Sequence, residues 1–296
     1  MKKKATKTIL VIGGTGFIGH HLLKKTTDLG WSSFCISRKK VVKNRFIKKV
    51  KYITLDINKK KNFKEIFRRA YDYVIDLSNT SLSSKTYSIK NLIRIINEKK
   101  IKKFIHVGSS AEYGNLGNLP LSEKLNCKPV SRYGKKKLDI TKNLLRIYKK
   151  NPFPIIVLRL FQVYGPNDDK NKIIPFILDN CLRNRKFKLT KGYQTRDFCH
   201  INDVVQAIIL FLKSRKKTLF GNIFNVGTGK SITIKKLVRM IKKNIEYGQP
   251  IFGAKKISKN EIIFSKSSTI KTKQYINWNS KISLEKGLKE LIYNAG

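Results

Sequence analysis

Tyr133 and Lys137 stand four residues apart, and on a helix that spacing places a phenol and an ammonium on one face. A tyrosine ordinarily has a pKa of about 10. A cation about 4 Å away, at an effective dielectric constant of about 20, favours the phenolate by about 4 kcal/mol, or about three pKa units. We therefore expect Lys137 to bring Tyr133 close to neutral pH, where general acid/base catalysis is most effective. In a chain with 65 Lys and Arg residues the same spacing is also typical of an ordinary exposed helix pair. Other residues must therefore decide whether this pair is catalytic.

A glycine-rich loop near the N-terminus predicts a cofactor site. The segment Gly13-Gly-Thr-Gly-Phe-Ile-Gly19 follows a short apolar run directly and opens a helical pattern. Gly16 would let the backbone approach a pyrophosphate, Gly19 would let the helix pack on the strand, and the helix N-terminus would supply unpaired N–H groups. We predict a dinucleotide-binding loop with contacts from Gly13, Gly16, Phe17, Ile18 and Gly19.

The segment after the second expected strand bears on which dinucleotide is bound. A carboxylate that binds the adenosine ribose is expected about 20 residues after the loop, but Cys35-Ile-Ser-Arg-Lys-Lys40 contains none. Arg38 is instead suited to hold a 2′-phosphate with its planar guanidinium. We therefore favour NADP(H) over NAD(H). Asp56 and Ile57 are candidates for the adenine edge, and Leu77 for the wall beside the cofactor.

These residues need a scaffold, and the sequence predicts one. Short apolar runs alternate with helical patterns in the first half of the chain, which is typical of βαβ units. The expected strands are 8–12, 34–37, 52–55, 73–77, 104–108 and 155–160, and the expected helices are 20–29, 63–70, 89–99 and 133–149. We predict an α/β Rossmann fold with a doubly wound parallel sheet, whose ligands bind beyond the carboxyl ends of the strands.

The pattern loosens after Pro166, which predicts a second, smaller part. Helices are expected at 173–183, 202–212, 233–244 and from 284 onward, with strands at 186–190 and 223–226. We expect a dinucleotide-binding domain over residues 1–165, to which residues 200–228 return. Residues 166–199 and 229–296 would then form a C-terminal substrate-binding lobe.

Composition excludes several classes of protein. The chain has 296 residues, 41% hydrophobic and 10% aromatic, which predicts a globular rather than a disordered protein. No apolar stretch approaches the ~20 residues of a membrane span, and the first apolar run is too short for a signal peptide. We therefore expect a cytoplasmic protein with no membrane partner. The four cysteines lie far apart, which predicts reduced thiols and no metal site.

The formal charge of +47 raises nucleic-acid binding as a hypothesis. The basic residues, however, are spread along the whole chain and are mostly lysine, whereas proteins that read nucleic acids rely on bidentate arginine and localised basic stripes. We therefore expect no nucleic-acid partner, although some lysines can steer an anionic substrate.

Ser109 adds a third member to the catalytic set. It follows the expected strand 104–108 and precedes Tyr133 by 24 residues. With it, the chain resembles the extended short-chain dehydrogenase/reductase family, the NAD-dependent epimerase/dehydratase group that acts on nucleotide sugars. The resemblance covers nearly the whole chain. It is carried by the motifs GGTGFIG, SSAEYG, YGKKK, LRLFQVYGP, QTRDF and FNVGTG, and by Trp278 and the ISLEKGL tail.

The resemblance implies a role for each matching residue. Tyr133 would be the general acid/base on the sugar, Lys137 would lower its pKa and hold the nicotinamide ribose, and Ser109 would hydrogen-bond the reacting oxygen. Arg196 of QTRDF matches an arginine that grips the substrate diphosphate. The other substrate-binding candidates are Ser110, Gln162, which stands where relatives often carry Asn, and Lys188. Members of the family often form homodimers through two long helices, here 89–99 and 133–149.

Departures from the family pattern narrow the reaction. Ser110 and Ala111 stand where relatives that eliminate water carry acidic residues, and Glu112 is one residue out of register, which disfavours a 4,6-dehydratase. Ala111 also stands where relatives that epimerise both C3 and C5 use a cysteine. Hydride transfer at one carbon remains, and the basic residues after the second strand favour reduction of a 4-keto-6-deoxy sugar nucleotide at C4 with Tyr133 as general acid.

Two alternatives stay open. The nearer one is a nucleotide-sugar 4-epimerase that holds NAD tightly through an internal cycle of oxidation and reduction. The remote one is a non-catalytic protein that senses a cofactor or associates with RNA, because a fold alone never fixes function.

Overall fold

The computed structural model describes residues 6–56, 66, 69–78, 93 and 96–294. The chain divides into two compact units. Unit 1 consists of Met1–Gly108, Lys136–Arg159 and Ile208–Phe224, and unit 2 consists of Ser109–Lys135, Leu160–Ala207 and Asn225–Gly296. Both units are therefore assembled from segments that are far apart in the sequence.

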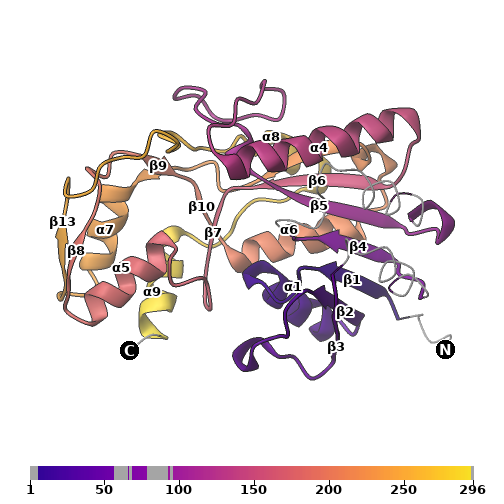
Figure 1. The fold of residues 1–296 in the computed structure, drawn as a ribbon, viewed down its shortest axis with the longest axis horizontal. Helices are drawn as coiled ribbons and strands as arrows, with labels where there is room; N and C mark the ends of the chain where they lie inside the picture. The colour runs from indigo at the N-terminus through magenta and orange to yellow at the C-terminus, as the bar shows by residue number, and fades with distance from the viewer. Residues whose placement is uncertain (1–5, 57–65, 67–68, 79–92, 94–95, 295–296) are drawn as a thin grey trace. The chain divides into compact units, whose positions relative to one another are not determined.

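A seven-stranded sheet organises the first unit (Figure 1). Its strands lie in the order β11 (Asn222–Val226), β6 (Ile155–Leu160), β5 (Lys103–Ser109), β4 (Tyr73–Asp76), β1 (Thr8–Ile12), β2 (Ser32–Ser37) and β3 (Val50–Thr54). The pairings from β5 to β3 are all parallel, with Ile12 opposite both Ile36 and Asp76. The strand order reverses between β1 and β4, which confirms the predicted doubly wound sheet and marks the point where such folds bind ligands.

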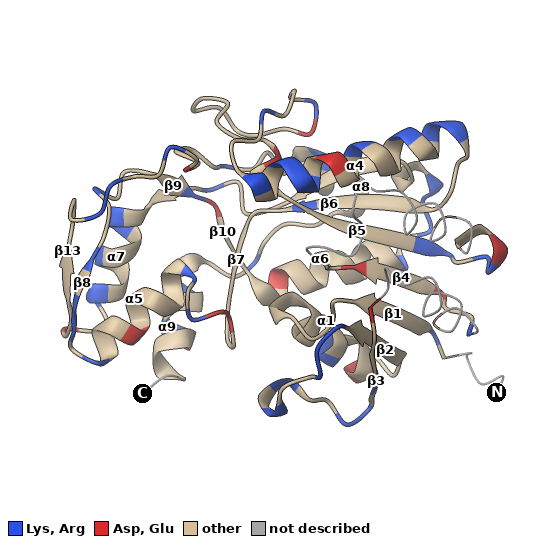
Figure 2. Ribbon diagram, viewed as in Figure 1, with Lys and Arg blue, Asp and Glu red and all other residues tan. Residues whose placement is uncertain are grey.

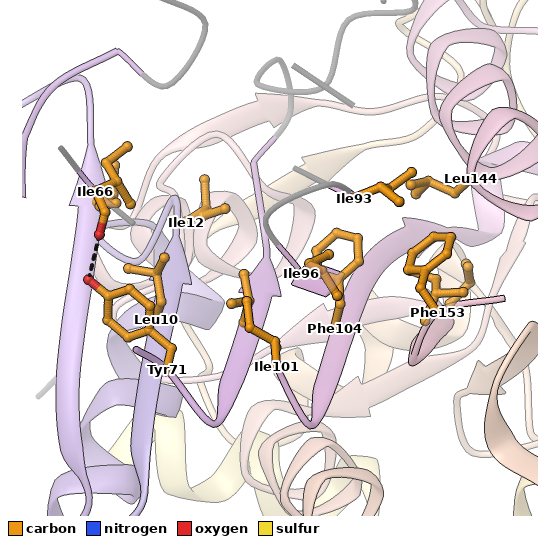
Figure 3. Close-up of a cluster of buried hydrophobic side chains, with 14 of the residues drawn as sticks. Leu10, Ile12, Ile66, Tyr71, Ile93, Ile96, Ile101, Phe104, Leu144 and Phe153 are labelled. Carbon is orange, nitrogen blue, oxygen red and sulfur yellow. Dashed lines mark hydrogen bonds between the residues drawn. The ribbon is translucent and has the colours of Figure 1, made fainter. Parts of the chain in front are cut away.

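Helices cover both faces of this sheet, because successive side chains of a strand point to opposite faces. Leu10 and Ile12 share a buried cluster with Ile140 and Leu144 of α4 (Arg132–Lys150). Figure 3 shows this cluster, in which the Tyr71 hydroxyl donates to the carbonyl oxygen of Ile66 at 3.1 Å. Each fully buried aliphatic side chain stabilises the fold by about 1.5–3 kcal/mol.

The opposite face carries α1 (Phe17–Asp28) and the end of α6 (Ile201–Lys213). A Cβ built on Gly14 would meet Cys35 Sγ at 2.7 Å, Leu23 of α1 at 2.9 Å and Val11 at 3.2 Å, so α1 packs on the face that Val11 and Cys35 present. Lys103, at the start of β5, is 5% exposed. Its Nζ donates to the carbonyls of Phe211 and Leu212 at 2.8 Å and to that of Ser214, so a buried cation binds the carboxyl end of α6.

Unit 2 has its own core between three helices: α5 (Ile173–Leu182), α7 (Ile234–Lys242) and α9 (Leu284–Tyr293). Three short strand pairs accompany them. These are β7 (Gln162–Tyr164) with β10 (Phe198–His200), β9 (Thr195–Arg196) with β12 (Ile232–Thr233), and β8 (Lys186–Lys188) with β13 (Gln249–Ile251). In the described part of the chain the further elements are α8 (Ile270–Ile276) and the 3₁₀ turns η1 (Lys43–Arg45), η2 (Ser110–Glu112) and η3 (Lys217–Leu219).

Most expected elements of the sheet are present with small changes in their bounds. The helix expected at 20–29 begins at Phe17, directly after the glycine loop, and the strand expected at 186–190 ends at Lys188. Residues 63–70 and 89–99, both expected to be helical, lie largely outside the described residues. The two- and three-residue strands β7, β9, β10, β12 and β13 were not predicted, because so few residues carry no periodic signal.

The described residues also show how basic side chains, apolar helices, potential metal ligands and cysteines are distributed. Figure 2 shows Lys and Arg on α4, on α7 and in the loop after β2 rather than on one element. In the described part of the chain no helix is both long and apolar enough to cross a membrane. The same residues contain no cluster of His, Cys, Asp or Glu that could hold a metal ion, and all four cysteines are free, with Cys127 the one that is not buried.

Candidate active site

The glycine loop between β1 and α1 has the shape that a cofactor cradle requires. A Cβ on Gly19 would lie 2.5 Å from Gly14, and a Cβ on Gly13, whose φ is +78°, would lie 3.1 Å from the Ser78 amide nitrogen. At Gly16, in contrast, the Gly13 carbonyl oxygen lies 3.4 Å from the Cβ position, and no other described residue lies within 4 Å of it. Gly13 and Gly19 thus allow close packing within the protein, while Gly16 at the start of α1 leaves room for a pyrophosphate. This geometry fits a dinucleotide.

The far end of the loop is held by residues that the sequence did not single out. The Thr15 and Ser37 hydroxyl oxygens lie 2.9 Å apart, and Arg45 donates to the Thr15 carbonyl at 3.2 Å. Arg38 follows Ser37 and is exposed. A hydroxyl and two guanidinium groups therefore lie on the described residues at and after the end of β2, with no carboxylate from 35 to 40.

The other expected cofactor residues are placed as follows. Leu77 continues β4 and its amide donates to the Ile12 carbonyl at 2.9 Å, so it adjoins the glycine loop at the reversal of strand order. Asp56 follows β3 and is half-buried, and Phe17 and Ile18 form the first turn of α1. Ile57 lies outside the described residues.

Ser109 ends β5, and neighbouring residues hold both its hydroxyl and its backbone amide. Its hydroxyl accepts from the Ala111 amide at 3.2 Å, and the Glu112 carboxylate accepts from the Ser109 amide at 2.9 Å, which is a capping box around η2. Glu112 is fully buried. Its carboxylate therefore positions Ser109, a use that the sequence did not reveal.

Tyr133 is brought to Ser109 by a close approach of α4 to η2. A Cβ on Gly134 would lie 2.3 Å from the Ala111 carbonyl oxygen, so only glycine allows this approach. The Ser131 hydroxyl accepts from the Gly134 amide at 3.0 Å and so caps the start of α4. The Tyr133 phenol, on the residue before Gly134, lies close enough to the Ser109 side chain for hydrogen bonding to act on its pKa.

The protonation of Tyr133 differs from the expectation. Removal from water raises the pKa of the phenol, hydrogen bonding to Ser109 opposes this, and the Glu112 carboxylate raises the pKa further. The net result is a pKa above the ordinary value of about 10. The expected lowering by Lys137 is therefore wrong for the protein without ligands. A protonated phenol at neutral pH is a proton donor.

Lys137 lies one helical turn after Tyr133 but its ammonium points into the protein. It is 2% exposed, and its Nζ donates to the Val107 carbonyl at 2.8 Å and to the Ser78 carbonyl at 3.1 Å. Val107 lies within β5, and Ser78 follows β4. The two carbonyl groups therefore hold the ammonium of Lys137 against the sheet of unit 1.

The expected substrate residues of unit 2 occupy short strands and one turn. Arg196 in β9 is half-buried and donates to the carbonyls of Thr195 at 2.8 Å and Ile262 at 2.7 Å, and it forms an ion pair with Glu261. Three of its five N–H donors are thus used within the protein. Arg196 also lines a pocket of about 530 Å³, together with Lys230 and Lys236.

The remaining substrate candidates are less closely associated. The backbone amide of Gln162 donates to the backbone carbonyl of Asp197 at 3.0 Å. This bond joins β7 to the residue after Arg196. Ser110 begins η2 beside Ser109, whereas Lys188 ends β8 and is exposed. Within unit 2 the structure therefore brings Ser109, Ser110 and Tyr133 together, and it brings Gln162 near Arg196.

Known proteins of similar sequence span almost the whole chain. The chain is 28% identical to CDP-abequose synthase of Salmonella typhimurium, with 96% of this chain and 97% of that protein covered. It is 26% identical to a putative UDP-glucose 4-epimerase of Methanocaldococcus jannaschii, with the same coverage. Among solved structures, UDP-glucose 4-epimerase of Thermotoga maritima with UDP-glucose superimposes with a TM-score of 0.87 at 24% identity, covering 97% of this chain and 98% of that chain. At this identity the structural likeness establishes the fold.

Family membership follows from a match that covers both the glycine loop and the catalytic pattern. The sequence model of the NAD dependent epimerase/dehydratase family matches residues 9–227, well over half of the chain. The protein is therefore an enzyme of the NAD dependent epimerase/dehydratase family.

Proposed function

We propose that the enzyme reduces a 4-keto-6-deoxy sugar nucleotide at C4 with NADPH. The observation that carries this proposal is the association of a protonated Tyr133 with Ser109 at the end of β5. When bound, the nicotinamide supplies the hydride. Tyr133 donates its proton to the C4 oxygen, and the Ser109 hydroxyl stabilises the negative charge that develops there.

Lys137, Arg196 and the glycine loop have supporting roles in this proposal. Gly13, Gly16 and Gly19 hold the pyrophosphate at the start of α1, and Lys137 holds the nicotinamide ribose. Arg196 binds the substrate diphosphate with the N–H donors that Glu261 and the carbonyls leave, beside the cationic pocket wall. Ser110, Gln162 and Lys188 complete the substrate contacts.

Elimination of water is disfavoured by the residues after Ser109. Ser110 and Ala111 are not acidic, and the Glu112 carboxylate is buried with the Ser109 amide bound to it. A dehydratase needs an acid that can reach the leaving group and the sugar proton. Glu112 is committed to the capping box, which supports a reaction that needs Tyr133 alone as the proton donor.

The nearest alternative is a 4-epimerase with tightly bound NAD. The relative from Methanocaldococcus jannaschii, a putative UDP-glucose 4-epimerase, supports it. CDP-abequose synthase is named for a product that is itself a nucleotide sugar and supports the same substrate class. The absence of a carboxylate from 35 to 40 and the exposed Arg38 favour an exchanging NADPH and hence the reductase.

An assay with purified protein separates the two reactions. We expect loss of the absorbance of NADPH on addition of at least one of a panel of 4-keto-6-deoxy sugars linked to dTDP, GDP, CDP or UDP. The protein should be isolated without bound nicotinamide. Epimerisation of a plain UDP-hexose by protein that retains NAD⁺, with no NADPH consumption on any panel member, would reverse the assignment.

Arg38→Ala tests the choice of cofactor. A charge-assisted hydrogen bond is worth about 1.5–3 kcal/mol, so we expect the Kd for NADPH to rise about 10- to 100-fold. The Kd for NADH should stay within about twofold, because NADH has no 2′-phosphate. Quenching of nicotinamide fluorescence measures both constants, and Lys40→Ala, another exposed cation nearby, is the control. Equal effects on NADPH and NADH would remove Arg38 from the 2′-phosphate site.

We also propose a homodimer, on the family resemblance. The helix that would take part, α4, exposes Arg132, Lys135, Lys142, Arg146, Lys149 and Lys150 but only one acidic residue, Asp139. Pairing of two such faces would bring like charges together. A dimer formed through α4 therefore has to strengthen as added salt screens this repulsion.

A further inference from the structure

In unit 1 a network of hydrogen bonds links Lys137 to a buried carboxylate and a buried imidazole. The proposed reaction gives these two groups no role. Asp76 ends β4 and His106 lies opposite it on β5; both are fully buried. The His106 Nδ1 atom lies 2.9 Å from Asp76 Oδ2. The other carboxylate oxygen, Oδ1, accepts from the Ser78 amide at 3.0 Å and from the Ser78 hydroxyl at 2.6 Å. The Ser78 carbonyl in turn accepts from Lys137 Nζ.

The carboxylate of this network is ionised despite its burial. Burial alone raises the pKa of Asp76, but the hydrogen bond and charge of His106, the charge of Lys137 and the hydrogen bonds from Ser78 outweigh it, so the pKa is lowered. Among the described residues, His106 on β5 and Lys137 on α4 are the titratable groups whose charges act on this carboxylate. A buried carboxylate of this kind requires a compensating positive charge.

Lys137 supplies such a charge through a short chain of hydrogen bonds. Its Nζ donates to the Ser78 carbonyl at 3.1 Å, and the Ser78 amide and hydroxyl donate to Asp76 Oδ1. The charge of Lys137 also contributes to the lowered pKa of Asp76. His106 binds the other carboxylate oxygen from the neighbouring strand. The negative charge of Asp76 and the ammonium of Lys137 therefore stabilise each other.

We propose that Asp76 is the counter-ion that keeps Lys137 protonated and in place, and that His106 orients the Asp76 carboxylate. Asp76 and His106 are thus positioning residues that act on the reaction through Lys137. The Asp76 carboxylate sets the position of Ser78, whose carbonyl binds the ammonium, and it supplies the charge that makes the buried ammonium stable.

Asp76→Asn tests the charge with little change in shape. Asparagine keeps an oxygen to accept from Ser78 but removes the negative charge. We expect Lys137 to lose its proton about one pH unit lower than in the wild-type enzyme, since an opposite charge nearby favours the charged form. NMR of protein labelled with ¹⁵N in its lysine side chains measures this, with the Lys137 signal assigned by its loss in Lys137→Arg. An unchanged titration of Lys137 overturns the proposal.

The kinetic consequence rests on the proposed function. In Asp76→Asn the alkaline limb of the kcat profile should move to lower pH by about one unit, while KM for the sugar nucleotide changes less than about threefold. Titration of Lys137 is independent of turnover. A shifted titration with no turnover of any 4-keto sugar nucleotide would therefore contradict the proposed function and leave the role of Asp76 standing.

Asp72→Asn is the matched control. Asp72 directly precedes β4, and its carboxylate accepts from the Thr8 amide at 2.8 Å and pairs with Lys102. This variant also loses a hydrogen-bonded carboxylate at an end of β4, so stability should fall, but neither the Lys137 titration nor the alkaline limb should move. An equal shift of the Lys137 titration in Asp72→Asn would show that the effect of Asp76→Asn is a general structural one, and would contradict the proposed role of Asp76.

A double variant keeps the proposal testable if Asp76→Asn folds poorly. Asp76→Asn combined with Lys137→Met removes both charges, and urea unfolding should find it at least about tenfold more folded at equilibrium than additive effects predict. Additive losses would overturn the pairing of Asp76 with Lys137.

Discussion

Tyr133→Phe is expected to lower kcat by about 10²- to 10⁴-fold, because a positioned general acid contributes that much to proton transfer. The substitution removes only the hydroxyl, and Tyr133 is 44% exposed, so the melting temperature and the Kd for the cofactor should change little. Steady-state assays with the reactive sugar nucleotide, alongside cofactor titration, measure both. Tyr293→Phe, which alters a highly exposed tyrosine at the end of α9, is the control and should keep wild-type kcat. A Tyr133→Phe enzyme with wild-type turnover would remove Tyr133 from the reaction.

The raised pKa of Tyr133 also predicts a pH profile. Because the pKa lies above its ordinary value of about 10, the phenol is protonated throughout the neutral range. Reduction needs the proton, so its rate should stay level through neutral pH and fall as pH rises through the pKa of the phenol or of the Lys137 ammonium, whichever is lower. The reverse oxidation needs the phenolate, so its rate should rise over the same interval. A reduction rate that increases with pH would contradict the role of Tyr133 as the acid.

Gly134→Ala is expected to lower kcat about 100-fold although residue 134 contributes no reactive group. A Cβ at this position would lie 2.3 Å from the Ala111 carbonyl oxygen, so α4 and η2 must move apart. A displacement of about 1 Å between catalytic groups can reduce the rate about 100-fold, and overpacking of this kind costs about 1–3 kcal/mol of stability. Steady-state kinetics and urea unfolding test both parts.

Gly117→Ala is the control for the loss of stability. A Cβ at Gly117 has no neighbour among the described residues within 4 Å, so the expected strain comes from its φ of +83°. We expect this variant to lose about 1 kcal/mol of stability from that backbone strain and to keep wild-type kcat. If Gly134→Ala also retained kcat, the close approach of α4 to η2 would have no part in placing Tyr133 beside Ser109.

The sheet could be predicted because most of its strands are largely apolar and longer than the strands of unit 2. Thr8–Ile12 and Ile155–Leu160 have the same bounds in the structure as in the prediction. Parallel strands buried on both faces produce such runs, and the intervening helical patterns identify the doubly wound topology. The strand pairs of unit 2 have two or three residues each, such as Thr195–Arg196, and so gave no comparable signal.

The proposed catalytic residues lie in short contiguous motifs, whereas the residues that support them are paired across long stretches of sequence. Ser109, Tyr133 and the glycine loop belong to contiguous motifs. Asp76 and His106 stand 30 residues apart on neighbouring strands, and Glu261 pairs with Arg196 across 65 residues. Only the register of the sheet and the packing of loops bring such pairs together. The same reasoning explains the error over Lys137, because helical spacing fixes the direction of a side chain but not which strands its ammonium will reach.

The buried ammonium of Lys103 shows that the lysines of this chain are not equivalent, so the net charge cannot be lowered by replacing any lysine. Most of the lysines that the structure describes are exposed and so open to reagents that methylate or acetylate amines. Lys103, held by the last carbonyls of α6, becomes open to them only when the protein unfolds. Its modification therefore reports global opening of unit 1. A redesign that lowers the net charge has a free choice among exposed lysines but has to leave this internal cation in place.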